Sequence, residues 1–269
     1  MSDQAASFTG NIPENYDRGL GPVYFADFAA AMARQVAALA PSRVLETSAG
    51  TGIVTRCLRD LLPAATQLTA TDLNSPMLDV ARAKFGAAEK IAFQPADATA
   101  LPFPDQAFDA VVCQFGVMFF PDKAKSYREA HRVLAPGGHY LFSVWDAHRH
   151  NPPGRVLHEL LGELLPDDPP RFFEIPYAYC ALDPIKEAVG EAGFTDFRVA
   201  VHRIEKLVAD AAGFARGLIY GNPVFEQIRS RGADPDEILN ALAAALHREF
   251  GPEPYRVPLQ AILFEAMRR

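Results

Sequence analysis

The sequence predicts an α/β fold built on a parallel sheet, and three observations lead to this prediction. Apolar runs alternate with helical patterns between Val44 and Trp145. A first apolar run ends in Glu46, and a small-residue turn that reaches Gly52 and a helical pattern follow it. A second apolar run, ~20 residues further on, ends in Asp72. Strand–helix alternation implies right-handed βαβ units, and such sheets bind ligands at the carboxyl ends of their strands.

The composition narrows the class of protein. The chain has 269 residues, of which 49% are hydrophobic, enough for one α/β domain with an elaboration. The formal net charge is −7 and no basic run exceeds a pair, so we expect no nucleic-acid partner. Without an apolar run of ~18 residues or a signal pattern in residues 1–4, we expect no membrane span and a cytoplasmic location. Cys57, Cys113 and Cys180 are odd in number and widely separated, which predicts neither a disulfide framework nor a zinc site.

The first loop and the second strand end indicate a nucleoside-containing cofactor. A carboxylate at Asp72 is placed to accept hydrogen bonds from a ribose. A dinucleotide fingerprint read from Gly50 would place Thr55 at its third glycine, and this β-branched residue is too large for close helix packing. The carboxylate of Glu46 would also repel a pyrophosphate but suits a cationic group.

The segment from Glu46 to Gly52 resembles the first motif of the class I S-adenosylmethionine-dependent methyltransferases, (D/E)-x-G-x-G-x-G. Ser48 stands where the first glycine usually is, and its Cβ restricts positive φ and close approach. The resemblance implies S-adenosylmethionine as the cofactor. It also implies a cofactor-binding role for the loop residues Glu46, Thr47, Ser48, Ala49, Gly50 and Gly52.

The segment from Asp72 to Leu78 is similar to the second motif of this family, D-x-S-x-x-M-L. The resemblance implies that Asp72 takes the ribose hydroxyls and that Leu73 and Met77 sandwich the adenine. We expect Ser75 to cap the next helix, with Pro76 in its first turn. The alternative is an ordinary helix start with Met77 in the core.

Two further strand ends complete the expected cofactor site. Asp97 and Ala98 match the positions that recognise the adenine amino group and a ring nitrogen in the resembling family. The alternative for Asp97 is an Asx-type turn. A turn and a buried fourth strand follow, and we expect its tip, Gln114 and Phe115, to line the adenosine and methionine portions. The Pro-Gly-Gly turn after Ala135 separates a helix from the fifth strand and is assigned no chemistry.

The N-terminal segment, residues 1–40, is expected to fold over the cofactor. Residues 1–20 are predicted as a mobile lead-in and Val23–Leu39 as an amphipathic helix. The resemblance implies a tyrosine near the cofactor's carboxylate, and Tyr16 is the candidate. A surface tyrosine in a loop is the alternative.

The second half of the chain is predicted only in outline. A helix is expected from residue 154 to 165, one with Asp183 as its cap and Pro184 in its first turn, and a strand over 197–204. Helical patterns cover residues 209–220 and 235–250. The resemblance implies a doubly wound, seven-stranded, mostly parallel sheet whose last strand is antiparallel. The expected parts are a cofactor-binding core over 41–146, helices and a sixth strand over 147–208, a helical cap over 209–257 and the last strand over 258–269.

The resemblance is closest to the ubiquinone/menaquinone-biosynthesis-like branch and implies in-line methyl transfer to O, N or C of a small-molecule acceptor. His148 and His150 are candidate bases, and they are otherwise exposed loop histidines; their spacing lacks a third metal ligand, so no metal is predicted. No catalytic residue or oligomeric state is assigned. A non-catalytic cofactor-binding protein and an NAD-dependent oxidoreductase remain alternatives. A cluster of aromatic residues forms either an acceptor pocket or the core of the cap: Phe172, Phe173, Tyr177, Tyr179 and Tyr220.

Overall fold

The computed structural model describes residues 6–269. They form a seven-stranded sheet of order β3-β2-β1-β4-β5-β7-β6. Strands β1 to β5 pair in parallel, and β7 runs antiparallel to both of its neighbours, so the predicted fold class is confirmed. The strands are β1 Arg43–Thr47, β2 Gln67–Asp72, β3 Ile91–Pro95, β4 Phe108–Gln114, β5 Leu134–Trp145, β6 Thr195–Val208 and β7 Tyr255–Met267.

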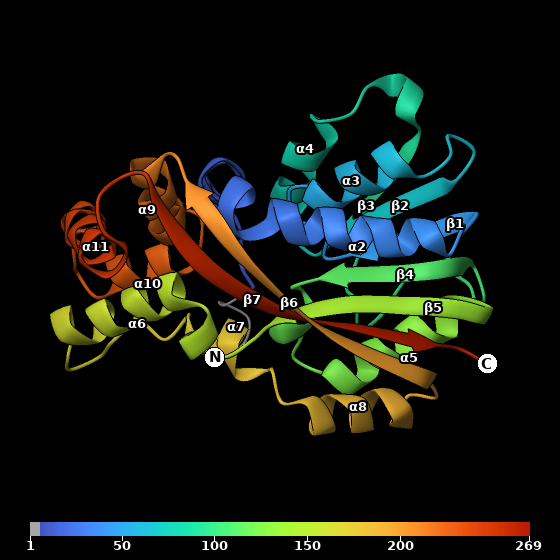
Figure 1. Cartoon of the computed structure of the whole chain (residues 1–269). Helices are drawn as coiled ribbons and strands as arrows, with labels where there is room; N and C mark the ends of the chain where they lie inside the picture. Colours follow the sequence, from blue (N-terminus) through green and yellow to red (C-terminus); the bar gives the residue numbers. More distant parts are fainter. Residues whose placement is uncertain (1–5) are drawn as a thin grey trace.

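Helices cover both faces of this sheet (Figure 1). The helices α2, α3 and α4 lie on one face and α5 and α8 on the other, while α6, α9, α10 and α11 gather beyond one end. Successive residues of a strand serve opposite faces, so Val44 packs with Met32 and Leu58, whereas Leu45 belongs to the other core. The helices are α1 Ile12–Asn15, α2 Ala26–Ala38, α3 Ile53–Leu61, α4 Ser75–Arg82, α5 Lys123–Val133, α6 Pro152–Leu164, α7 Glu174–Ala178, α8 Leu182–Glu191, α9 Ala211–Tyr220, α10 Val224–Ser230 and α11 Pro235–Phe250.

The strand order reverses between β1 and β4, which are neighbours in the sheet although two strands separate them in sequence. In open α/β sheets a crevice opens at such a switch point, outside the carboxyl ends of the strands. Glu46 and Gln114 lie at these ends of β1 and β4. The fold therefore brings the first loop and the tip of β4 to one place.

The N-terminal segment is helical rather than a mobile lead-in. Residues 1–5 lie outside the described residues, but α1 is followed by a π-helix, η1 Tyr16–Phe25, which runs directly into α2. The prediction of a lead-in up to residue 20 was wrong because Gly19, Gly21 and Pro22 mask the helical pattern. Burial of Leu20 and of the apolar side chains after it holds this segment against the domain.

The N-terminal segment and α9 pack in direct backbone contact at glycine residues. A Cβ placed on Gly19 would lie 2.5 Å from the carbonyl oxygen of Gly213 and 2.7 Å from Cα of Gly217. A Cβ on Gly221 would lie 2.9 Å from Cα of Tyr16. The two elements can approach this closely only because these positions carry no side chain. This packing places the end of α9 beside Tyr16.

Several predicted boundaries were wrong. Asn74, not Ser75, occupies the cap position of α4, and Ala181, not Asp183, that of α8. The last strand begins at Tyr255 rather than at residue 258, and the helix α10 was not predicted. The division of the chain into a core and a cap stays a prediction. Within the described residues, none of the helices is long and apolar enough to cross a membrane.

Candidate functional site

The loop after β1 adopts left-handed backbone at its small residues. The φ angle is +54° at both Ser48 and Gly50. A left-handed serine is unusual, and the structure shows what accommodates its side chain: a Cβ on Gly116 would lie 2.5 Å from the Ser48 Cβ. The missing side chain at Gly116 therefore makes room for the one that Ser48 adds to the motif.

Glu46 is a buried acid at the end of β1, with 2% of its surface exposed. Burial raises the pKa of its carboxyl to about 8, against an opposing hydrogen bond of 2.6 Å that the Thr55 hydroxyl donates. The negative charge of Asp72 raises this pKa further. A cationic ligand group would offset the cost of ionising this carboxyl. Thr55, which breaks the dinucleotide fingerprint, thus holds the acid of the loop.

Asp72 connects the loop to the N-terminal segment. One carboxylate oxygen accepts from the Gly50 backbone N–H at 2.9 Å, and the other from the Asn74 backbone N–H at 2.8 Å. Burial raises the pKa of Asp72, while these hydrogen bonds lower it. The Asn74 side chain in turn accepts from the Phe8 N–H at 3.2 Å and donates to the Ala6 carbonyl at 2.9 Å. Sequence reasoning missed Asn74 as a site residue, although its place inside the motif from Asp72 to Leu78 was a signal.

Asp97 forms the Asx-type turn that the sequence left as an alternative. Its carboxylate accepts from the Thr99 N–H at 2.7 Å and from the Thr99 hydroxyl at 2.9 Å. The turn still leaves Asp97 and Ala98 on the wall of a cavity that Leu73 and Met77 also line. Leu73 is 62% exposed, which is unusual for leucine and leaves an apolar surface free to contact a ligand.

Three adjoining cavities meet at this edge of the sheet. The large cavity encloses about 1150 Å³ of space, partly open to solvent, and Asp72 and Asp97 line it. The polar pocket, about 310 Å³, lies against Glu46 and the loop that follows it. The aromatic chamber, about 440 Å³, lies between the N-terminal segment, β5 and the helices at the end of the sheet. Tyr16 is on the wall of all three cavities, Gln114 borders the first two, and Phe115 borders the first and the third.

The polar pocket contains buried polar atoms that have no partner among the described residues. These are the Gln114 side-chain oxygen and the Thr51 hydroxyl. Buried polar atoms are normally hydrogen-bonded, so an unpaired pair beside the acid Glu46 points to a ligand with both donors and acceptors. An amino acid end, with an ammonium and a carboxylate, has this composition.

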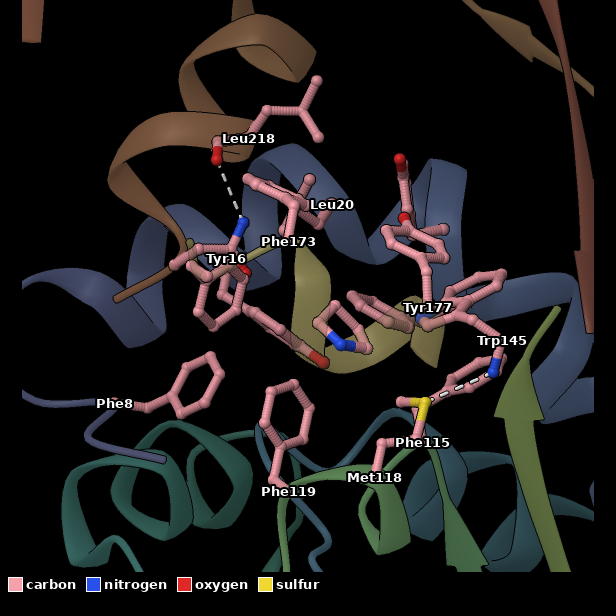
Figure 2. A pocket seen from close by; sticks show the side chains of 15 residues that line it. Phe8, Tyr16, Leu20, Phe115, Met118, Phe119, Trp145, Phe173, Tyr177 and Leu218 are labelled. Carbon is pink, nitrogen blue, oxygen red and sulfur yellow. Dashed lines mark hydrogen bonds between the residues drawn. The ribbon is translucent and has the colours of Figure 1, made fainter. Parts of the chain in front are cut away.

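The aromatic chamber is closed by rings from distant parts of the chain. Figure 2 shows Phe8, Tyr16 and Phe119 gathered at one end of it, with Trp145 and Tyr177 at the other. The Phe115 and Trp145 rings stack at 4.0 Å, and Tyr16 stacks on Phe25 at 4.6 Å. No Asp, Glu, Lys, Arg or His side chain of the described residues lines it. The full lining is Phe8, Tyr16, Leu20, Tyr24, Phe25, Phe115, Met118, Phe119, Trp145, Phe172, Phe173, Pro176, Tyr177, Leu218 and Asn222.

The aromatic cluster of the sequence is divided between chamber and scaffold. Phe172, Phe173 and Tyr177 line the chamber. The Tyr179 hydroxyl instead lies 3.0 Å from that of Tyr127, and Tyr220 donates to Asp236 at 2.5 Å. These last two tyrosines stabilise the fold around the chamber.

The two candidate histidines do not line any of these cavities. His148 and His150 lie in a short 3₁₀ turn, and both are half-buried, so the description as exposed loop residues was also wrong. The His148 Nε2 lies 2.9 Å from the Phe173 carbonyl oxygen. Burial lowers the pKa of His148, and the neighbouring His158 lowers it further. His148 therefore stabilises the position of Phe173, which lines the chamber, without lining the chamber itself.

Two of the predicted cofactor residues, Thr47 and Gly52, contribute to the packing of the fold rather than to a cavity wall. The Thr47 hydroxyl donates to the Val112 carbonyl at 3.4 Å, and a Cβ on Gly52 would lie 2.8 Å from the Ala81 Cβ, so these positions serve packing. Neither residue lines a cavity, and their predicted contact with the cofactor stays a prediction. Each of the others lines at least one cavity: Tyr16, Glu46, Ser48, Ala49, Gly50, Asp72, Leu73, Met77, Asp97, Ala98, Gln114 and Phe115.

The chain is similar to known methyltransferases in sequence. A family model described as a methyltransferase domain matches residues 45–142. The demethylmenaquinone methyltransferase of Thermus thermophilus is 46% identical over 100 residues, which are 37% of this chain and 45% of that one. A ubiquinone/menaquinone biosynthesis C-methyltransferase of Shewanella is 31% identical over 187 residues, which are 60% of this chain and 72% of the relative. The chain thus spans about half the length of the first of these relatives and most of the second.

Solved structures share the fold. A putative methyltransferase from Bacillus halodurans superposes with a TM-score of 0.57 at 23% identity and covers 89% of this chain and 98% of its own. A possible histamine N-methyltransferase from Thermotoga maritima gives 0.57 at 15% identity over the whole of both chains. With the match to the Shewanella relative, the chain belongs to the S-adenosylmethionine-dependent methyltransferase family, in the branch of the ubiquinone/menaquinone-biosynthesis methyltransferases.

Proposed function

We propose that this protein transfers a methyl group from S-adenosylmethionine to a small, uncharged acceptor held in the aromatic chamber. One observation carries the proposal: Tyr16 is on the wall of all three cavities, so a polar site suited to a nucleoside and an amino acid adjoins an apolar site that is partly open to solvent. An enzyme that joins two substrates needs such a junction, because it must bring their reacting atoms together.

The residues of the large cavity and the polar pocket fit the cofactor. In this proposal Asp72 accepts from the ribose hydroxyls, and Asp97 from the adenine amino group, next to the apolar surfaces of Leu73 and Met77. The ammonium of the methionine end would pair with Glu46, whose burial otherwise disfavours ionisation. The Thr51 hydroxyl, which lacks a partner among the described residues, can donate to the carboxylate.

The chamber contributes orientation and exclusion of water. When bound, the cofactor would supply a sulfonium methyl group to an electron pair on an O, N or C atom of the acceptor, and the carbon–sulfur electron pair would stay on the departing neutral thioether. The methyl donor is already activated, so the enzyme's main tasks are to align the two partners and to exclude water. The aromatic walls of the chamber suit both tasks. No carboxylate or imidazole of the described residues lines the chamber, so this proposal assigns no side chain there as a base.

The relatives inform the class of acceptor. Their names are demethylmenaquinone methyltransferase and ubiquinone/menaquinone biosynthesis C-methyltransferase. An apolar ring would suit the aromatic walls of this chamber. We therefore propose an uncharged, largely apolar small molecule as the acceptor.

Calorimetric titration with S-adenosylmethionine, S-adenosylhomocysteine and NAD⁺ tests the cofactor. We expect micromolar binding of both adenosyl compounds and none of NAD⁺, whereas binding of NAD⁺ alone would overturn the proposal. Formation of S-adenosylhomocysteine in the presence of a panel of apolar ring acceptors then tests transfer. Tight cofactor binding without turnover for any acceptor would favour the non-catalytic alternative.

A further inference from the structure

We propose that Asn222 is a specificity-determining residue, whose side-chain oxygen accepts a hydrogen bond from a hydroxyl or N–H group of the acceptor. The inference rests on the proposed function, and it narrows the acceptor to an apolar molecule that carries a hydrogen-bond donor. Asn222 lies between α9 and α10, outside the region matched by the family model.

The amide nitrogen of Asn222 is already used by the protein. It donates to the Leu218 carbonyl oxygen at 3.1 Å and to that of Gly217 at 3.4 Å, both in the last turn of α9; the Gly217 carbonyl also accepts from the Gly221 backbone N–H at 3.0 Å. These bonds fix which side of the carboxamide faces the helix. The side-chain oxygen accepts no hydrogen bond from the described residues and keeps accessible surface, in a residue that lines the chamber and is 7% exposed overall.

An acceptor oxygen held in this way discriminates between ligands. The other side-chain polar groups of the residues that line the chamber are the hydroxyls of Tyr16, Tyr24 and Tyr177, which can rotate to donate or to accept, and the indole N–H of Trp145, which can only donate. The Asn222 oxygen can only accept. A ligand without a donor would leave it buried and unpaired, and an unpaired buried polar group costs free energy.

The backbone next to Asn222 places it near the other cavities. A Cβ on Gly221 would lie 2.9 Å from both Cα and the backbone nitrogen of Tyr16. Asn222 therefore enters the chamber beside the residue that borders all three cavities. A donor group bound to Asn222 lies at the side of the chamber formed by the N-terminal segment and α9.

The test uses two probes that differ by one donor, 4-propylphenol and 1-fluoro-4-propylbenzene, with the protein saturated with S-adenosylhomocysteine. Trp145, the single tryptophan of the chain, is on the chamber wall, so its fluorescence reports binding. The measured quantity is the ratio of the two dissociation constants in the wild type, in Asn222→Leu and in Asn222→Ser. The serine hydroxyl can bond back to a helix carbonyl, so this variant keeps a bond to the end of α9, while its shorter side chain removes the carboxamide oxygen from its place in the chamber. Tyr220→Phe is the matched control, because it removes a hydrogen bond from the same end of α9 outside the chamber.

We expect the preference for the phenol to fall by about threefold to tenfold in both Asn222 variants and to stay unchanged in Tyr220→Phe. An unchanged ratio in either folded Asn222 variant would overturn the inference. In the wild type, the preference for the phenol over the fluoro compound must be larger than their partition between water and octanol predicts. A preference no larger than this, or no binding of either probe, would also overturn the inference. S-adenosylhomocysteine affinity separates the two proposals, since its absence in the wild type refutes the proposed function, whereas its presence with an unchanged ratio refutes only the role of Asn222.

Discussion

The affinity for S-adenosylmethionine should rise with pH, because Glu46 must ionise to pair with the cofactor's ammonium. Burial raises the pKa of this carboxyl to about 8. The carboxyl is then roughly one-tenth ionised at pH 7 and roughly one-hundredth ionised at pH 6. The dissociation constant of the cofactor should therefore increase about tenfold when the pH falls from 7 to 6. Above about pH 8 the α-amino group of the ligand loses its proton, and the gain should end there.

Calorimetry in two buffers of different ionisation enthalpy measures this effect directly. Near pH 6.5 the wild type should release about 0.9 proton for each cofactor bound, since an initially neutral carboxyl becomes ionised. Glu46→Gln is the matched control, because its carboxamide keeps an oxygen for the Thr55 hydroxyl but has no proton to release. A dissociation constant that stays constant from pH 6 to 7, or equal proton release by both proteins, would refute the pairing of Glu46 with the ammonium.

Three further predictions follow from the site and the loop. Asp72→Ala should weaken cofactor binding by about 1.5–3 kcal/mol through loss of a charge-assisted hydrogen bond, while His148→Ala should bind normally; calorimetry decides, and normal binding by Asp72→Ala would move the site elsewhere. Gly116→Ala should lower the free energy of unfolding, measured in urea, by about 1–3 kcal/mol, and adding Ser48→Gly should restore part of this loss. A Gly116→Ala protein as stable as the wild type would contradict the close contact between Gly116 and the Ser48 Cβ. Without cofactor, the free energy of unfolding should fall by up to about 1.4 kcal/mol per pH unit between about pH 5 and pH 8, relative to Glu46→Gln, because the native carboxyl keeps a proton that the unfolded chain has lost; parallel pH profiles would refute the raised pKa.

Most residues of the predicted cofactor site lie together on the cavity walls, and the sequence could place them there because its signals are local. A strand end, a turn of small residues and a helix start lie within a few positions of one another, as in Glu46 to Gly52 and Asp72 to Met77. Backbone geometry at such turns depends mainly on the residues that form them. The compensation of Ser48 by Gly116 could not be predicted, since these residues lie on different strand ends that only the sheet brings together.

The chamber could not be predicted from the sequence because its walls are assembled from distant segments. Phe8, Tyr24, Trp145 and Phe172 meet only after the N-terminal segment packs on the sheet and on α9. The glycines that allow this packing weaken the helical pattern of residues 16–25, so the feature that builds the chamber also hid it. The ambiguity of the aromatic cluster has the same origin, since burial in a core and exposure to a cavity require the same residue types.

The shared wall has a consequence for the energetics of binding. Phe8 and Tyr16 line both the large cavity and the chamber, and Asn74 ties the backbone around Phe8 to Asp72. A molecule in the large cavity therefore restricts the residues that shape the chamber, so the two sites are thermodynamically linked. By reciprocity, whatever factor the cofactor contributes to the affinity for the acceptor, the acceptor returns to the affinity for the cofactor. The N-terminal segment would thereby couple the two binding events.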